Sequence, residues 1–116
     1  MIKFKSGSVN IKVFTPALSL ILYRLEFFHR NRLTEQPEDI VITSVNDSVH
    51  GENSKHYIDQ AIDIRSKNFP SSAAKAEFRK EFERVLGPDE FTVIIENLGT
   101  ENEHFHVQVK KGRTFP

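Results

Sequence analysis

Apolar residues recur along this chain with two different spacings, and the change between them is the strongest constraint on its fold. Over residues 16–32 and again over 72–86 they return every three or four positions, which is the spacing of an α-helix with one buried face. Elsewhere they alternate with polar residues or form short β-prone runs, the pattern of strands. A chain with both spacings is expected to pack amphipathic helices against a sheet.

Capping signals delimit both predicted helices. Thr15-Pro16 has the arrangement of an N-cap followed by proline at the first helical position, and this helix is expected to run to about Arg32. Ser71 or Ser72 can cap the second helix, and Gly87-Pro88 ends it. The predicted buried stripes are Leu18, Ile21, Leu22, Leu25 and Phe27 or Phe28 in the first helix, and Ala74, Phe78, Phe82 and Val85 in the second.

Alternation and β propensity predict five strands, over residues 8–14, 40–45, 61–65, 91–96 and 103–110. The last two are expected to form a hairpin around a glycine-containing turn. The element order is strand, helix, strand, strand, helix, strand, strand. It favours a small α+β domain with helices on one face of a mainly antiparallel sheet. The chain has 116 residues, and we expect 1–116 to form a single domain.

Composition excludes several kinds of function. The chain has no cysteine, so a metal can be held only by His, Asp or Glu, and a cysteine nucleophile is excluded. Sixteen basic side chains balance sixteen acidic ones, which leaves no positive field for nucleic acid. The most apolar stretch, residues 17–28, contains Arg24 and Glu26 and is too short to span a membrane. The amino terminus lacks the pattern of a signal peptide, so we expect synthesis in the cytoplasm.

Histidine and aspartate residues supply a candidate metal site. Because side chains alternate across a strand, His104 and His106 share one face of theirs, and Asp63 points away from the isoleucines beside it. His56 lies seven positions before Asp63, near enough for a turn to bring both to one ion. A set of His56, Asp63 and His106 leaves one coordination position open, as catalytic zinc requires. In the alternative, the histidines are scattered and Asp63 pairs with Arg65.

Three short motifs carry a resemblance to a known family. They are Ser54-Lys-His56, Ala61-Ile-Asp63 and Glu103-His-Phe-His106, and the strand over 40–44 has the Val/Ile-Thr-Ser sequence that leads into the first of them. In this order they resemble the motifs of zinc D-Ala-D-Ala peptidases. That family includes the vancomycin-resistance dipeptidases and the phage endolysins that cut D-Ala-D-Ala or L-Ala-D-Glu bonds of peptidoglycan. The resemblance covers about residues 40–110 and implies a hedgehog-like α+β fold.

The resemblance implies a role for each matching residue. His56, Asp63 and His106 would bind Zn²⁺, and Glu103 would act as the general base on the attacking water. Residues three apart on a flat strand face opposite ways, so Glu103 can reach that water only if the chain bends before His106. His104 would contact the substrate or the tetrahedral intermediate, or remain a surface histidine.

Two positions depart from the family's pattern. Asp59 stands where the motif usually has glycine, and no arginine lies between Leu33 and Ile64, where members of the family often place one to hold the substrate. His50 is therefore our candidate for stabilising the oxyanion, with Lys55 as the alternative.

The leading prediction is a zinc-dependent peptidase of phage-endolysin type. We expect a monomer that is made in the cytoplasm of a host cell and acts at the bacterial cell wall on peptidoglycan stem peptides, with no nucleic acid or membrane as partner. One alternative is a non-catalytic cell-wall or virion module that keeps the fold. Another is an Fe(II) oxygenase in which His104 and His106 bind iron together with a carboxylate.

Overall fold

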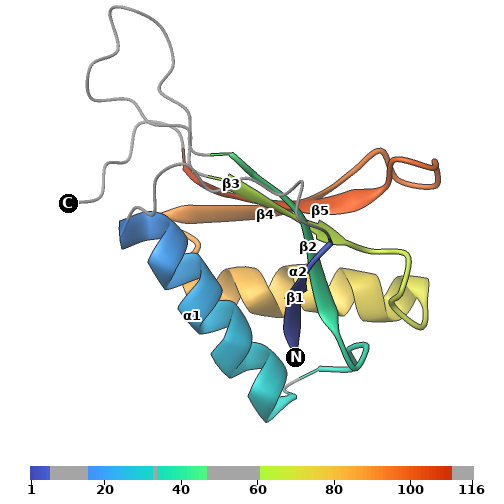
Figure 1. The fold of residues 1–116 in the computed structure, drawn as a ribbon, viewed down its shortest axis with the longest axis horizontal. Helices are drawn as coiled ribbons and strands as arrows, with labels where there is room; N and C mark the ends of the chain where they lie inside the picture. The colour runs from blue at the N-terminus through green and yellow to red at the C-terminus, as the bar shows by residue number, and fades with distance from the viewer. Residues whose placement is uncertain (6–15, 33, 47–60, 111–116) are drawn as a thin grey trace, which may run out of the picture.

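The computed structural model describes residues 1–5, 16–32, 34–46 and 61–110. Within them, two helices cover one side of a five-stranded sheet (Figure 1). In chain order the elements are β1 (Ile2–Phe4), α1 (Pro16–Asn31), β2 (Ile40–Asn46), β3 (Ala61–Arg65), α2 (Ser72–Leu86), β4 (Phe91–Glu96) and β5 (His104–Val109). The α+β class expected from the sequence is confirmed.

The observed elements follow the predicted ones closely, with one exception at the amino terminus. β3 and β4 have the predicted bounds, α1 and β2 differ from theirs by one residue at one end, and β5 is shorter than predicted by one residue at each end. β1 was not predicted, because three residues are too few to show alternation. The strand predicted over 8–14 lies outside the described residues.

The sheet is mostly antiparallel, with the strand order β1-β2-β3-β5-β4. β1 runs parallel to β2, while β2 with β3, β3 with β5 and β5 with β4 are antiparallel pairs. β5 therefore lies between β3 and β4, although the chain reaches it last. This order places Asp63 of β3 directly across from His106 of β5, and Glu96 of β4 directly across from His104.

Helix α2 begins and ends as its capping residues predict. The Ser71 side chain accepts a hydrogen bond of 3.0 Å from the Ala74 amide, which satisfies one of the amides left free in the first turn. At the other end Gly87 has φ of 113° and donates its N–H to the carbonyl of Glu83. A positive φ of this kind favours glycine, because glycine lacks the Cβ that other residues carry.

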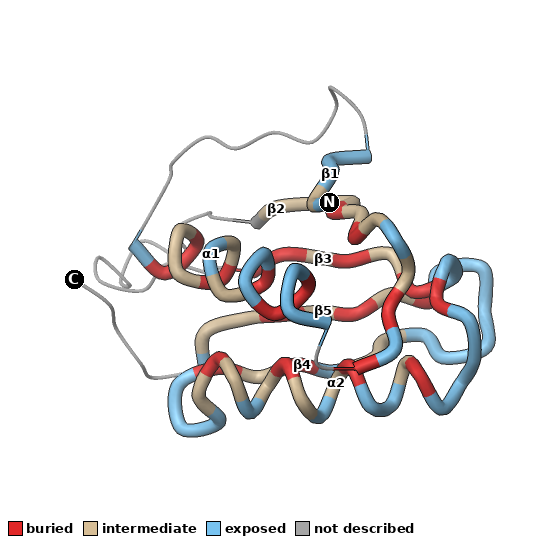
Figure 2. Tube along the Cα trace, turned by 90° about the horizontal axis from the view of Figure 1, so that it is seen from below, coloured by how far each residue is buried: buried red, intermediate tan, exposed pale blue. Residues whose placement is uncertain are grey.

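The core lies between the helices and the inner face of the sheet (Figure 2). Phe78 of α2 is at its centre, with its ring centroid 4.9 to 5.8 Å from those of Phe28, Phe69, Phe82 and Phe105. Each fully buried side chain of this size stabilises the fold by roughly 1.5 to 3 kcal/mol. The predicted stripe of α2 is confirmed at Ala74, Phe78 and Phe82, but Leu86 completes it and Val85 is only partly buried.

Arg24 joins the two helices. Its Nη1 donates to the carbonyl oxygens of Leu86 at 2.5 Å and Val85 at 3.3 Å, two of the carbonyls that the end of α2 leaves without helical partners. A cation at this end also interacts favourably with the helix dipole. Among the described residues, neither α1 nor α2 combines the length and the apolar character that crossing a membrane requires.

Candidate metal centre

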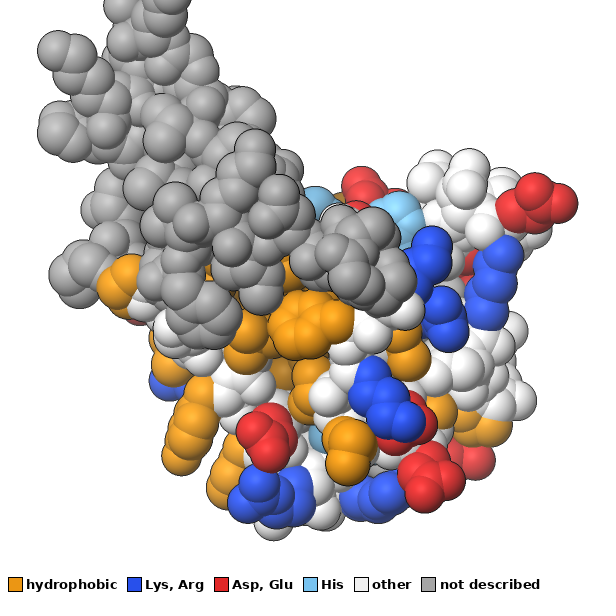
Figure 3. All heavy atoms as spheres, in the orientation of Figure 1, with side chains coloured by type: hydrophobic (Ala, Val, Ile, Leu, Met, Phe, Trp, Pro, Cys, Tyr) orange, Lys and Arg blue, Asp and Glu red, His pale blue; other side chains and the backbone are white. Residues whose placement is uncertain are grey.

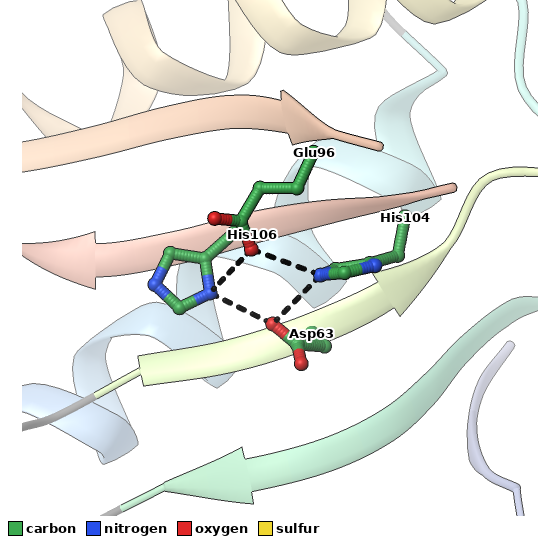
Figure 4. Close-up of side chains that lie close together, drawn as sticks. All are labelled: Asp63, Glu96, His104 and His106. Carbon is green, nitrogen blue, oxygen red and sulfur yellow. Dashed lines mark hydrogen bonds and ion pairs between the residues drawn. The ribbon is translucent and has the colours of Figure 1, made fainter. Parts of the chain in front are cut away.

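The face of the sheet opposite the helices carries a cluster of four ionisable side chains. Inward-facing Ile62, Ile64, Phe105 and Val107 are buried in the core, so the residues between them on β3 and β5 point outward. Asp63, His104 and His106 are therefore on the outer face, as the alternation in the sequence predicted. Glu96, at the end of β4, joins them (Figure 4).

One ligand atom from each of the four residues lies within 4.8 Å of the other three. His106 Nδ1 is 2.8 Å from Asp63 Oδ1, and His104 Nε2 is 3.0 Å from Glu96 Oε1. The cross distances are similar, at 3.7 Å from His104 Nε2 to Asp63 Oδ1 and 3.6 Å from His106 Nδ1 to Glu96 Oε1. Two nitrogen and two oxygen donors thus face one small volume, where they form a candidate site for a metal ion.

Hydrogen bonds behind the cluster orient both imidazole rings. The second ring nitrogen of His104, Nδ1, is 2.6 Å from the carbonyl oxygen of Asn102, and that of His106, Nε2, is 2.6 Å from Gln108 Oε1. Carbonyl and amide oxygens only accept, so each of these nitrogens carries the proton. His104 Nε2 and His106 Nδ1 can then present a lone pair to an ion, which is how metal-binding histidines are usually held.

A β-bulge in β2 supports the carboxylate of Asp63. The register between β2 and β3 shifts between Ile42 and Ser44, so that Ser44 rather than Thr43 is opposite Asp63. Ser44 Oγ donates to Asp63 Oδ2 at 3.0 Å, on the oxygen that does not contact His106. The extra residue re-aims a side chain, as bulges beside functional sites often do. Both oxygens of Asp63 are therefore held in place.

The contacts within the cluster shift the pKa values of His106 and Asp63. A hydrogen bond to Asp63 raises the pKa of His106 to about 9, against partial burial, with further contributions from Gln108 and Glu96. Partial burial acts to raise the pKa of Asp63, but hydrogen bonds from His106 and Ser44 outweigh it and hold that pKa below its usual value. Without an ion, the His106 ring is therefore protonated on both nitrogens and positively charged at neutral pH, and the Asp63 carboxyl group is ionised.

The residues present fit a divalent ion in both chemistry and charge. Imidazole suits zinc, copper, iron and nickel, and carboxylate oxygens complete such sites. The carboxylates of Asp63 and Glu96 supply two negative charges beside the imidazole nitrogens, which match the charge of a dication. Since His106 must lose its proton to bind, metal affinity is expected to depend on pH.

Two of the three predicted zinc ligands meet in the structure. Asp63 and His106 are 43 positions apart in the chain and in direct contact. The pairing of Asp63 with Arg65 that we considered is not observed among the described residues, since its oxygens contact His106 and Ser44. The third predicted ligand, His56, and the oxyanion candidates His50 and Lys55 lie outside the described residues, together with Ser54 and Asp59.

The structure does not bring Glu103 to the cluster. Its side chain is on the helix-covered face, where it accepts hydrogen bonds from Lys75 Nζ at 2.7 Å, Ser66 Oγ at 2.6 Å and the Gly99 amide at 3.2 Å. The bond from Lys75, helped by that from Ser66, lowers the pKa of Glu103 to about 2. The chain therefore does not bend between Glu103 and His106. The general-base role stays a prediction, and this environment does not favour it, because such a carboxylate is a weak proton acceptor.

Sequence reasoning missed Glu96 as a member of the cluster. It is the outward-facing residue at the end of β4, and the hairpin pairs it with His104. The alternation of Phe91, Val93 and Ile95 shows that Glu96 faces outward, but it does not show which residue of β5 is opposite. The register depends on the loop, in which Asn97 and Gly99 adopt positive φ.

Comparisons with known families, with characterised proteins and with solved structures gave no match for this chain.

Proposed function

We propose that this chain is a zinc-dependent peptidase that hydrolyses a peptide bond of peptidoglycan stem peptides, either D-Ala-D-Ala or L-Ala-D-Glu. The meeting of Asp63 and His106 carries the proposal, since the motif resemblance names these two residues as ligands and they contact each other at 2.8 Å. The ring orientation supports it too, because Gln108 holds the proton of His106 on the far nitrogen. The proposal includes action as a monomer at the bacterial cell wall.

In this proposal Asp63 Oδ1 and His106 Nδ1 are two ligands, and His56 is the third, as the resemblance implies. Zinc in such a site polarises a carbonyl group and lowers the pKa of water. His104 lies close enough to contact the substrate or to serve as a ligand itself, because its Nε2 is 3.7 Å from Asp63 Oδ1. Three or four protein ligands then surround the ion, within the range found in zinc enzymes.

Glu96 is better placed than Glu103 to accept a proton in this reaction. Its side chain is 41% exposed, and its Oε1 is 3.0 Å from His104 Nε2, on the same face as the ligands. Glu103 is held by Lys75 and Ser66 on the other face. We therefore propose Glu96 as the carboxylate that receives the proton of the attacking water, with His104 orienting it.

A second candidate function follows from the position of His104. Two histidines and one carboxylate that share one face match the ligand set of non-haem Fe(II) oxygenases. His104, His106 and Asp63 form such a set, with the two imidazole nitrogens and one carboxylate oxygen facing the same volume. The identity of the metal separates this candidate from the peptidase.

Metal analysis followed by digestion tests the proposal. We expect one zinc per chain in the purified protein, retained in the control Glu26→Ala on the exposed side of α1 and lost in His106→Ala. Stem peptides incubated with the zinc-loaded protein should gain a new amino end, detected by mass, and Glu96→Gln should slow this at least about 100-fold while it keeps zinc. Iron in place of zinc would support the oxygenase. Bound zinc with no cleavage of peptide or purified wall would support a non-catalytic module.

A further inference from the structure

A cavity of about 610 Å³ opens on the outer face of the sheet, beside the cluster. Asp63 and His104 line one part of it, and three basic side chains, Lys5, Arg65 and Lys67, line another. Figure 3 shows Lys and Arg side chains gathered next to the histidines on this face. A molecule in this cavity can thus contact the candidate metal site and the basic side chains at the same time.

The three basic residues reach the cavity from different parts of the chain. Arg65 lies two positions after Asp63 on β3, so both face outward, and it is directly across from His104. Lys67 follows the end of β3, and Lys5 follows β1, where its amide donates to the carbonyl of Ile42 at 2.8 Å. The sheet itself therefore fixes the position of Arg65, which lies on a strand.

The lining also holds three acidic residues, Asp63, Glu101 and Glu103, and the contacts of the described residues show how each is engaged. Asp63 is engaged with His106 and Ser44, and Glu103 with Lys75, while Lys67 Nζ donates to the backbone carbonyl of Glu101. Among the residues that the structure describes, no ion pair joins Lys5, Arg65 or Lys67 to a carboxylate. These three cations can therefore contact an anionic group that enters the cavity.

We infer that this cavity binds a carboxylate of the substrate peptide, with Arg65 as its main contact. The inference rests on the proposed function, because the cluster defines where the scissile carbonyl would be. A guanidinium offers paired N–H donors that match the two oxygens of a carboxylate, and such bonds are stronger than neutral ones. Lys5 and Lys67 add point charges around the same group.

Binding of defined peptides to the metal-free protein tests this, because hydrolysis does not consume the probe. The probes are a stem pentapeptide that ends in D-Ala-D-Ala, the same peptide with its terminal carboxylate amidated, and a third with the carboxylate of D-Glu amidated. In the wild type, we expect one of the two amidated peptides to bind with a Kd about tenfold or more above that of the unmodified peptide, as measured by calorimetry. In Arg65→Gln most of this preference should be lost. Lys80→Gln, an exposed cation of α2, should keep the full preference.

Two further observations make the outcome decisive. Lys5→Gln should reduce the preference without abolishing it, and it gives an independent result if Arg65→Gln does not fold. Equal binding of acid and amide peptides by the wild type, or an unchanged preference in Arg65→Gln, would overturn the inference. Hydrolysis is scored separately with zinc-loaded protein. A preference that depends on Arg65 without hydrolysis would leave the binding site standing and overturn the peptidase. Hydrolysis without a preference for the acid peptide would overturn the binding site and leave the peptidase standing.

Discussion

The two faces of the central strands differ in how their polar groups are held, and the neighbours Glu103 and His104 show the difference. Glu103 faces the helices, where three donors fix its carboxylate and its pKa is about 2. His104 faces outward, where its Nε2 is near two carboxylates and competes for them with His106. On the face that the helices cover, Glu103 has three fixed donors. The other face carries a cluster whose charges can be rearranged by a proton or a metal ion.

This contrast predicts which substitutions should change stability and which should change metal binding. A buried ion pair that is fully hydrogen-bonded tolerates no exchange of partners, because any loss leaves an uncompensated charge. The outer cluster is partly exposed, with His106 at 20% and Glu96 at 41% side-chain exposure, so its members can change partners at lower cost. Substitutions on the two faces should therefore change different properties.

The largest effect on stability is expected in the core. Phe78→Ala removes the ring that contacts four other phenylalanines and should lower the free energy of unfolding by about 3 to 5 kcal/mol. Urea unfolding followed by circular dichroism measures this. If the two faces are independent, the zinc affinity of the remaining folded protein changes less than about twofold. A large loss of zinc affinity in folded Phe78→Ala would show that they are not.

Glu103→Gln should have the next largest effect on stability. This substitution separates a structural role of Glu103 from a catalytic one. Leaving Lys75, which is 19% exposed, without its partner should cost about 2 to 3 kcal/mol of stability with little change in zinc binding or peptide cleavage. The lowered pKa also stabilises the folded state at pH values above 4.5, and this contribution is lost as the pH falls through about 2. The acid unfolding of the variant should therefore be less steep. Normal stability with abolished cleavage would instead establish Glu103 as the base.

The pH dependence of the outer cluster is the most gradual effect, because it changes the free energy of zinc binding by about 1.4 kcal/mol for each pH unit. Because zinc must displace the proton of His106, the Kd for zinc should fall about tenfold per pH unit between about 6.5 and 9. In the metal-free protein the raised pKa contributes stability that is complete below pH 6.5 and is lost as the pH rises through about 9. Asp63→Asn should lower the pKa of His106, measured from its ring proton resonances. An unchanged pKa would mean that Asp63 is not its main partner.

Much of the fold could be predicted because local signals agree with the tertiary structure. Ser71 and Gly87 mark the ends of α2, and alternation separates Ile62 and Ile64 from Asp63 on β3. The same alternation assigned His104 and His106 to the outer face. These are properties of neighbouring residues, which a single sequence displays.

The missing parts of the site depend on long-range register. Glu96 reaches the cluster only through the pairing of β4 with β5, and Ser44 only through the bulge in β2. The hydrogen bond that holds Glu103 comes from Lys75, 28 positions away on another element. No periodicity in the sequence specifies these three arrangements, because each is fixed by the packing of segments that are distant in the chain.

Zinc titration of the metal-free protein by calorimetry tests the central claim most directly, that Asp63 and His106 bind one ion. We expect one zinc per chain in the wild type, and affinity at least about 100-fold weaker in Asp63→Ala and in His106→Ala, with circular dichroism showing that both remain folded. Glu26→Ala should bind as the wild type does. Zinc bound equally well by all four proteins, or by none of them, would contradict the claim.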